Sequence, residues 1–102
     1  MRQSAMSKDE MKGGATGYEI RVWLPAERVL RTLGEKELDQ VLKKIAALAK
    51  TPQPKDATKL VASHNRWRLK VGDIRIIYTV NEISKHVLIW AVRHKGDEYR
   101  WR

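Results

Sequence analysis

Three strand-like segments, separated by two short turns, follow one another near the end of the chain and restrict its fold more than any other feature. Trp67–Val71 alternates between apolar and basic side chains, Ile74–Val80 is rich in β-branched residues, and Val87–Val92 is an almost continuous apolar run. Gly72-Asp73 marks the first turn and Asn81–Lys85 the second. The pattern predicts three successive antiparallel strands, the last of them inside the sheet.

A strand pattern and two helical patterns precede these strands. Tyr18–Trp23 alternates as a half-buried strand does, and Pro25 suits the first turn of a short helix that we expect to end with Gly34 as its C′ residue. Thr51-Pro52 is expected to stop a second, longer helix. Its apolar stripe consists of Leu38, Val41, Leu42, Ile45, Leu48 and Ala49.

The order of these elements predicts the fold class. An N-terminal strand, a two-helix hairpin and a three-stranded antiparallel meander form an α+β domain, with the helices packed on one face of a mainly antiparallel sheet. Residues 1–17 are polar and rich in glycine, which predicts a flexible N-terminal tail. The 102-residue length leaves room for one domain, at residues 18–102.

The composition excludes several classes of protein. The chain has no cysteine and three dispersed histidines, so we expect neither a disulfide framework nor a metal site or other cofactor. No apolar run approaches the roughly 18 residues that span a bilayer, and the N-terminus lacks the apolar segment of a signal peptide. We therefore expect no membrane partner and a cytoplasmic location.

Positive charge is the strongest indication of function. The formal net charge is +9, and such a field attracts polyanions without specifying which one. A solvated basic face that only aids solubility is the alternative. Here, however, the charges alternate with strand-forming residues, so that Arg68, Lys70 and Arg75 are expected to form a cationic row on the face away from the helices, flanked by Arg66.

Two segments resemble the RelE/ParE superfamily of toxins. Residues 68–78 (RLKVGDIRIIY) resemble the core R-x-R-V-G-D-[YFI]-R-[VIL]-[IVL]-Y of these proteins, and residues 92–99 (VRHKGDEY) resemble their terminus V-x-H-R-x-D-x-Y. The resemblance also covers the order of strand, helical hairpin and three strands. Lys95 stands where the family commonly has arginine, and Arg93 where it usually has glycine.

RelE-like members are ribosome-dependent endoribonucleases that use the ribose 2′-OH to attack the adjacent phosphate without a metal. Such a reaction needs a base, an acid and cations beside the phosphorane. The resemblance places Arg75 at the phosphate-stabilising position, Lys95 at the C-terminal basic position and Tyr99 at the position for stacking or proton transfer. His94 offers an imidazole as base or acid. The predicted catalytic residues are Lys70, Arg75, His94, Lys95 and Tyr99, and the predicted RNA-binding residues are Arg66, Arg68, Lys70, Arg93 and Arg100.

Each prediction has a structural alternative. Arg75 would pair with Asp73 or Asp97 if its role were structural, Tyr99 would cap the core, and His94 would be a hydrogen-bonded structural histidine. The remaining tryptophan and histidine side chains are assigned to the core or to the surface from their positions in the strand and turn patterns. Trp67 and Trp90 are expected in the core rather than as stacking surfaces, Trp23 and Trp101 are less determined, and His64 and His86 are expected on the surface.

Two other functions fit the same motif. A ParE-like inhibitor of DNA gyrase shares the fold but catalyses nothing, and an inactive relative would only bind RNA or its antitoxin. The convergent set of basic residues with Tyr99 favours the ribonuclease, because a pure binder has less need of a phosphate site. The partners expected for a ribonuclease are a cognate antitoxin protein, the ribosome and messenger RNA; for the alternative, the partner is gyrase.

Overall fold

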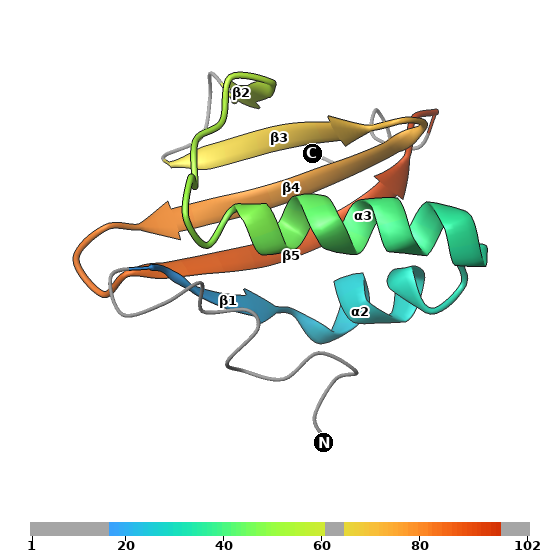
Figure 1. The fold of residues 1–102 in the computed structure, drawn as a ribbon, viewed down its shortest axis with the longest axis horizontal. Coiled ribbons are helices and arrows are strands. Elements are labelled where there is room, and N and C mark those ends of the chain that lie inside the picture. The colour runs from blue at the N-terminus through green and yellow to red at the C-terminus, as the bar shows by residue number, and fades with distance from the viewer. Residues whose placement is uncertain (1–16, 61–64, 97–102) are drawn as a thin grey trace.

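The computed structural model describes residues 17–60 and 65–96, and within them the predicted α+β architecture is confirmed (Figure 1). No helix in these ranges is long and apolar enough to cross a membrane. In chain order the elements are β1 (Glu19–Val22), α2 (Leu24–Leu30), α3 (Glu35–Ala47), β2 (Ala57–Lys59), β3 (Arg66–Val71), β4 (Ile74–Asn81) and β5 (His86–His94).

The strands form one sheet in the order β1-β5-β4-β3-β2. The predicted meander of β3, β4 and β5 is antiparallel throughout, and the turn between β3 and β4 has its single positive φ, 60°, at Gly72, as a type II′ hairpin requires. β1 lies at one edge and pairs in parallel with β5, from Glu19 opposite His86 to Val22 opposite Ile89. β2, at the other edge, was not predicted, because the strand has only three residues and they are mostly polar.

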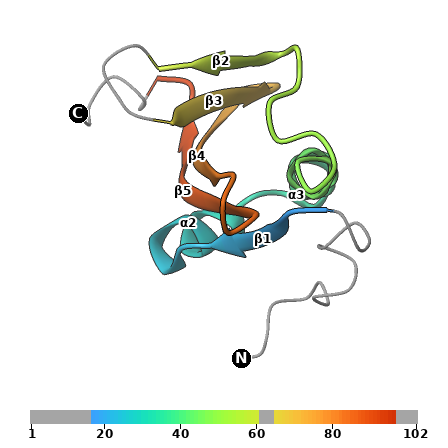
Figure 2. The ribbon, with the colours of Figure 1, turned by 90° about the vertical axis from the view of Figure 1, so that its left-hand side faces the viewer.

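The helices bury their apolar sides against the sheet. α3 crosses one face of it, as Figures 1 and 2 show, and its Val41 and Ile45 are completely buried. α2 continues from the end of β1 alongside β5 and contributes Ala26 and Leu30 to the same core. The remaining buried members of the core are Ile20, Leu48, Ala49, Leu69, Val71, Ile74, Ile76, Tyr78, Val80, Val87, Ile89 and Val92.

Two predicted helix boundaries are wrong. α2 ends at Leu30 with Arg31 as its C-cap, and Gly34 is instead the N-cap of α3, with an extended backbone (φ −66°, ψ 162°). The predicted role of Gly34 as a C′ residue therefore fails, since that position usually takes the left-handed conformation. α3 ends at Ala47, and the buried Leu48 and Ala49 follow it in the turn that leads away from the helix.

A β-bulge interrupts the pairing of β4 with β5. Ile77 lies opposite Ala91 but Tyr78 lies opposite Ile89, so Trp90 is the extra residue. A bulge of this kind shifts the alternation of side chains by one position. As a result Ile89 and Val92 both belong to the core, although strict alternation would place them on opposite faces. The same shift turns Arg93 to the face that α3 does not cover.

Tyr78 ties the end of the helical hairpin to the centre of the sheet. Its ring is completely buried, and its hydroxyl donates a 2.7 Å hydrogen bond to the carbonyl oxygen of Pro52, itself buried. Burial raises the pKa of Tyr78, and the nearby Asp56 carboxylate raises it further, so the hydroxyl keeps its proton and acts as a donor.

Replacing Tyr78 by phenylalanine tests this link. Tyr78→Phe keeps the ring but leaves a buried carbonyl oxygen without its donor, which costs roughly 1–3 kcal/mol. We expect the free energy of unfolding in urea to fall by that amount with an unchanged m-value. Tyr18→Phe, at a half-buried tyrosine outside the sheet, is the control and should change stability by less than about 0.5 kcal/mol. Equal stability of Tyr78→Phe and the wild type would contradict the proposed link.

Candidate nucleic-acid interface

The sheet face opposite α3 gathers most of the predicted RNA-binding residues. Leu69 and Val71 point into the core, so Arg66, Arg68 and Lys70 point the other way from β3. On β4, Arg75 and Thr79 lie on this same face, since Ile74, Ile76 and Tyr78 fill the core. The predicted alternation of β3 and β4 is confirmed, and we call this side of the sheet the open face.

Three cations lie directly across from one another on the open face. The pairing places Lys70 opposite Arg75, and Arg75 opposite Arg93, on three neighbouring strands. We call Lys70, Arg75 and Arg93 the cationic row. Like charges in directly opposite positions destabilise a sheet, because their Cβ atoms are only about 4.5–5.5 Å apart. None of the residues of β3, β4 and β5 is acidic. The row is thus a site where the fold concentrates positive charge.

Arg75 is held in place by the turn beside it. Its Nη1 donates hydrogen bonds to the carbonyl oxygens of Gly72, at 2.9 Å, and Ile74, at 3.2 Å. The side chain is half-buried, and its Nε, like those of Arg68 and Arg93, is buried. Asp97, one of the two carboxylates in the structural alternative for Arg75, lies outside the described residues. A guanidinium fixed in this way presents its charge without further ordering.

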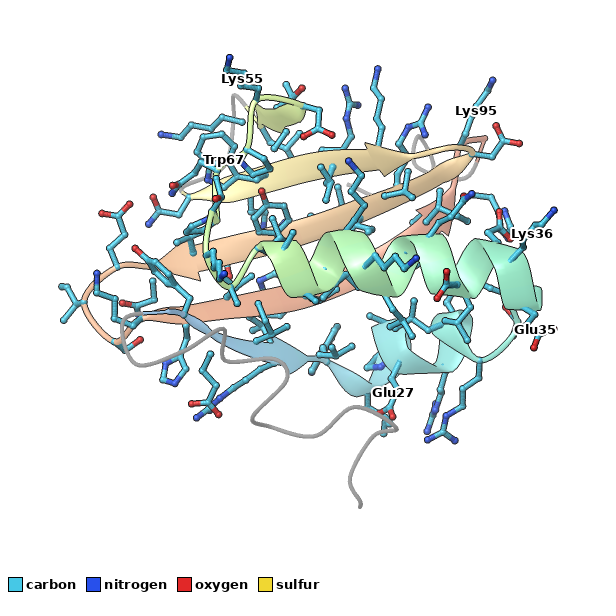
Figure 3. The ribbon with its side chains drawn as sticks, viewed as in Figure 1. Glu27, Glu35, Lys36, Lys55, Trp67 and Lys95 are labelled. Carbon is cyan, nitrogen blue, oxygen red and sulfur yellow. The ribbon has the colours of Figure 1, made fainter. Side chains whose placement is uncertain are left out.

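Lys95 comes to the same end of the sheet as the cationic row. Its backbone N–H donates a 2.8 Å hydrogen bond to the carbonyl oxygen of Asp73 in the β3–β4 turn, and its side chain is exposed (Figure 3). Lys95 is therefore fixed at the β3–β4 turn, to which the Arg75 guanidinium also bonds. Tyr99 and Arg100, also predicted in the site, lie outside the described residues.

His94 lies on the other face. It pairs with Ile74, whose side chain is in the core, and cross-strand partners point to the same side of a sheet. The exposed His94 imidazole thus leaves the end of β5 on the side of α3, away from Arg75 and Arg93. The prediction of His94 as base or acid came from its imidazole and its place in the C-terminal motif, and the sequence pattern assigned it to neither face.

Only one of the two tryptophans expected in the core packs there. Trp67 packs against the core, as predicted, but Trp90 does not, and that prediction is wrong. As the bulged residue, Trp90 turns to the open face, where its Nε1 donates a 2.9 Å hydrogen bond to the hydroxyl of Thr79. Trp23 meets it edge to face at 5.2 Å between ring centroids, and Arg66 lies 5.7 Å from the Trp90 ring centroid. Aromatic side chains thus adjoin the cations.

Acidic side chains are concentrated on the helices and on the loop that follows them. Glu27 pairs with Arg31 in α2, and Asp39 pairs with Lys43 in α3. Asp56, just before β2, accepts a hydrogen bond from Lys44, and that bond lowers the pKa of its carboxyl group. Within the described residues no group of three histidine, aspartate or glutamate side chains is placed to hold a metal ion. In the described residues the helices therefore carry side chains of both charges, whereas the open face carries cations.

The same arrangement of strands and helices is found in known toxins. The model of a family described as the ParE toxin of the type II toxin–antitoxin system, parDE, matches residues 18–99. The chain belongs to this family, within the RelE/ParE superfamily. As a RelE/ParE toxin it is one component of a type II toxin–antitoxin system. No curated protein sequence matches the chain.

Solved structures of RelE toxins share the fold of this RelE/ParE toxin. A chain of the archaeal RelE–RelB complex from Pyrococcus horikoshii OT3 is 25% identical, with a TM-score of 0.71 over 78% of this chain and 96% of that chain. The RelBE2 complex of Mycobacterium tuberculosis gives 22% identity and a TM-score of 0.68, over 76% and 98% of the two chains. The intact Escherichia coli RelBE complex gives 22% and 0.68, over 76% and 95%.

Lys70→Gln tests whether the cationic row costs stability and binds polyanions. Removing one charge from the row relieves repulsion, so the free energy of unfolding should stay equal or rise by up to about 1 kcal/mol. Affinity for single-stranded RNA should fall, with the slope of log K against log salt smaller by about 0.7. Both quantities come from urea unfolding and from binding titrations at several salt concentrations.

Lys59→Gln is the matched control. Lys59 is exposed on β2 opposite Trp67, and therefore on the side of α3. Lys59→Gln removes the same charge from the other face. The slope of log K against log salt should therefore stay closer to the wild-type slope than it does with Lys70→Gln. Equal effects of the two substitutions on RNA binding would mean that net charge, rather than the cationic row, attracts the RNA.

Proposed function

We propose that this toxin is a ribosome-dependent endoribonuclease that cleaves messenger RNA and so inhibits translation. The observation that carries the proposal is the cationic row, in which Arg75 stands between Lys70 and Arg93 on three paired strands. A site that only has to bind a partner has less need of three aligned cations at a repulsive spacing. Charge gathered at one point is what a phosphate gaining negative charge requires.

The reaction needs a base, positive charge beside the phosphorane, and an acid. A base takes the proton of the ribose 2′-hydroxyl while the 2′-oxygen attacks the adjacent phosphorus. The bond to the 5′-oxygen breaks and that oxygen takes a proton from an acid, which leaves a 2′,3′-cyclic phosphate and a 5′-hydroxyl. In this proposal Arg75, held by the β3–β4 turn, stabilises the phosphorane, with Lys70 and Arg93 beside it. Arg66 and Arg68 bind the flanking phosphates from the same face.

Proton transfer is assigned to the C-terminal residues. Lys95 is anchored at the β3–β4 turn beside the row, which supports a role for its ammonium in protonating or stabilising the leaving 5′-oxygen. Tyr99 keeps the stacking or proton-transfer role that the resemblance to the superfamily implies, and Arg100 is proposed to bind RNA only. His94 is a weaker candidate for base or acid, because its side chain leaves the sheet on the opposite face from Arg75.

The toxin is proposed to act with a cognate antitoxin protein that controls it. Similar structures include complexes of RelE with RelB from Pyrococcus horikoshii, Mycobacterium tuberculosis and Escherichia coli, which supports such a partner. A protein that neutralises a net charge of +9 would be expected to carry acidic residues toward the open face.

Inhibition of DNA gyrase is the second candidate, and the match to the ParE toxin family favours it. A gyrase inhibitor needs no proton transfer, and its basic residues would serve contact with a protein or with DNA. The two candidates differ in what a change at Arg75 does: it would abolish a catalytic step in the first case and weaken an interface by a smaller factor in the second.

Arg75→Ala tests the leading proposal in a purified translation system. Messenger ends are mapped by primer extension after addition of the wild type or the variant. We expect the wild type to cut messenger bound to ribosomes, and Arg75→Ala to cut about 10²–10³-fold more slowly, as when one stabilising donor is removed from a reacting oxyanion. Arg75→Lys should recover only part of the rate, because lysine lacks the planar fork.

Arg28→Ala is the control, since it removes an arginine from the exposed side of α2 with the same change of charge. It should cleave at the wild-type rate. Messenger that stays intact with wild-type toxin would refute the ribonuclease. A supercoiling assay with purified gyrase would then show whether inhibition takes its place.

A further inference from the structure

An open pocket adjoins the cationic row. It lies between α2 and the open-face side of β5, with a volume of about 320 Å³. Arg93 belongs both to the row and to the wall of the pocket. The principal side chains around it are Trp23, Ala26, Val29, Arg66, Trp90 and Arg93.

The aromatic wall of this pocket is fixed although it is partly exposed. Trp90 is anchored by its hydrogen bond to Thr79 and by the bulge, and Trp23 packs edge to face against it. The backbone N–H of Trp23 donates a 3.0 Å hydrogen bond to the carbonyl oxygen of Ile89, which fastens the start of α2 to β5. Nevertheless 49% of Trp23 is exposed to solvent. A large ring held in place at a surface is suited to stacking on a planar ligand.

The charges around the pocket favour a nucleobase over an apolar peptide. Two arginines line it, Arg66 and Arg93, and none of its lining residues is acidic. An apolar segment would take the Arg66 guanidinium out of water without offering it an acceptor, which is unfavourable. A base offers acceptors along its edge and a face that stacks on tryptophan or on an arginine plane.

We propose that this pocket takes one base of the RNA strand whose phosphate lies on the cationic row. The inference rests on the proposed function in that RNA is the substrate, and it adds the subsite that positions the strand. Trp23 stacks on the base, and Trp90, which meets Trp23 edge to face, borders it. Arg66 and Arg93 contact the edge of the base or the adjoining phosphate, and Arg93 connects the pocket to the cationic row. Trp23 is then a positioning residue, because it touches the substrate away from the reacting atoms.

RNA with single missing bases tests the subsite directly. The probe is a short single-stranded RNA of mixed sequence, with 2′-O-methyl groups that block cleavage and one abasic nucleotide moved along the strand. We expect one abasic position to weaken binding by the wild type about tenfold, the effect of losing one stacked base. Trp23→Ala should bind the intact RNA about tenfold more weakly and lose less than about twofold further at that abasic position.

Leu24→Ala is the matched control. Leu24 is the next residue, is 52% exposed, and does not line the pocket. It should bind intact and abasic RNA as the wild type does. Circular dichroism of each variant shows whether the fold is intact, and because Trp23 is half-exposed its removal should leave the fold in place.

Several outcomes would overturn the inference. The first is that each abasic position weakens RNA binding by the same factor in the wild type and in Trp23→Ala. The second is that the wild type does not bind the RNA at all. The third is that Trp23→Ala keeps its RNA affinity but no longer binds its antitoxin. The last result would assign the pocket to a protein. A Trp23-dependent abasic effect in a wild type that cleaves no messenger would uphold the subsite and refute the ribonuclease.

Discussion

The β-bulge at Trp90 governs which side chains of β5 face the core and which face the open side. If Trp90 were paired regularly instead of bulged, the alternation that buries Ile89 would also point Arg93 inward and Val92 outward. A buried, unpaired guanidinium costs several kcal/mol, so the fold and the cationic row depend on the same irregularity. The bulge also turns Trp90 outward, where Thr79 and Trp23 hold it. Because Trp90 is accommodated as a bulge, Arg93 stays in the row and the Trp90 ring stands next to it on the same face.

The row lies on strands whose other face is part of the core. Cations opposite one another on three strands oppose pairing of those strands, and this cost must be offset by burial elsewhere. The compensation lies on the reverse face, where Ile74 and Ile76 of β4 pack with Val41 and Ile45 of α3, all completely buried. One face of β4 therefore packs in the core and stabilises the fold, and this stability allows positive charge to be concentrated on the other face.

The sequence was sufficient for the parts of this design that follow strict periodicity. Alternation in β3 and β4 correctly placed Lys70 and Arg75 together, and the helical stripe correctly identified the core side of α3. It failed where periodicity is broken or too short to detect. The continuous apolar run of β5 hides its bulge, which misplaced Trp90 in the core, and β2 has only three residues. Gly34 was misassigned because a glycine suits either end of a helix, and its backbone is extended.

Register alone gives the row its geometry, and this limits how much specificity the row can hold. Three cations fixed by strand pairing attract any phosphate of suitable approach, whether in messenger RNA or in DNA, because phosphate contacts position a strand without reading it. Discrimination must then come from what borders the row. On one side that is the β3–β4 turn with Lys95, and on the other the pocket formed by Trp23 and Trp90. Since both features flank the common basic motif, members of one superfamily can keep the motif and differ in target by changing only its borders.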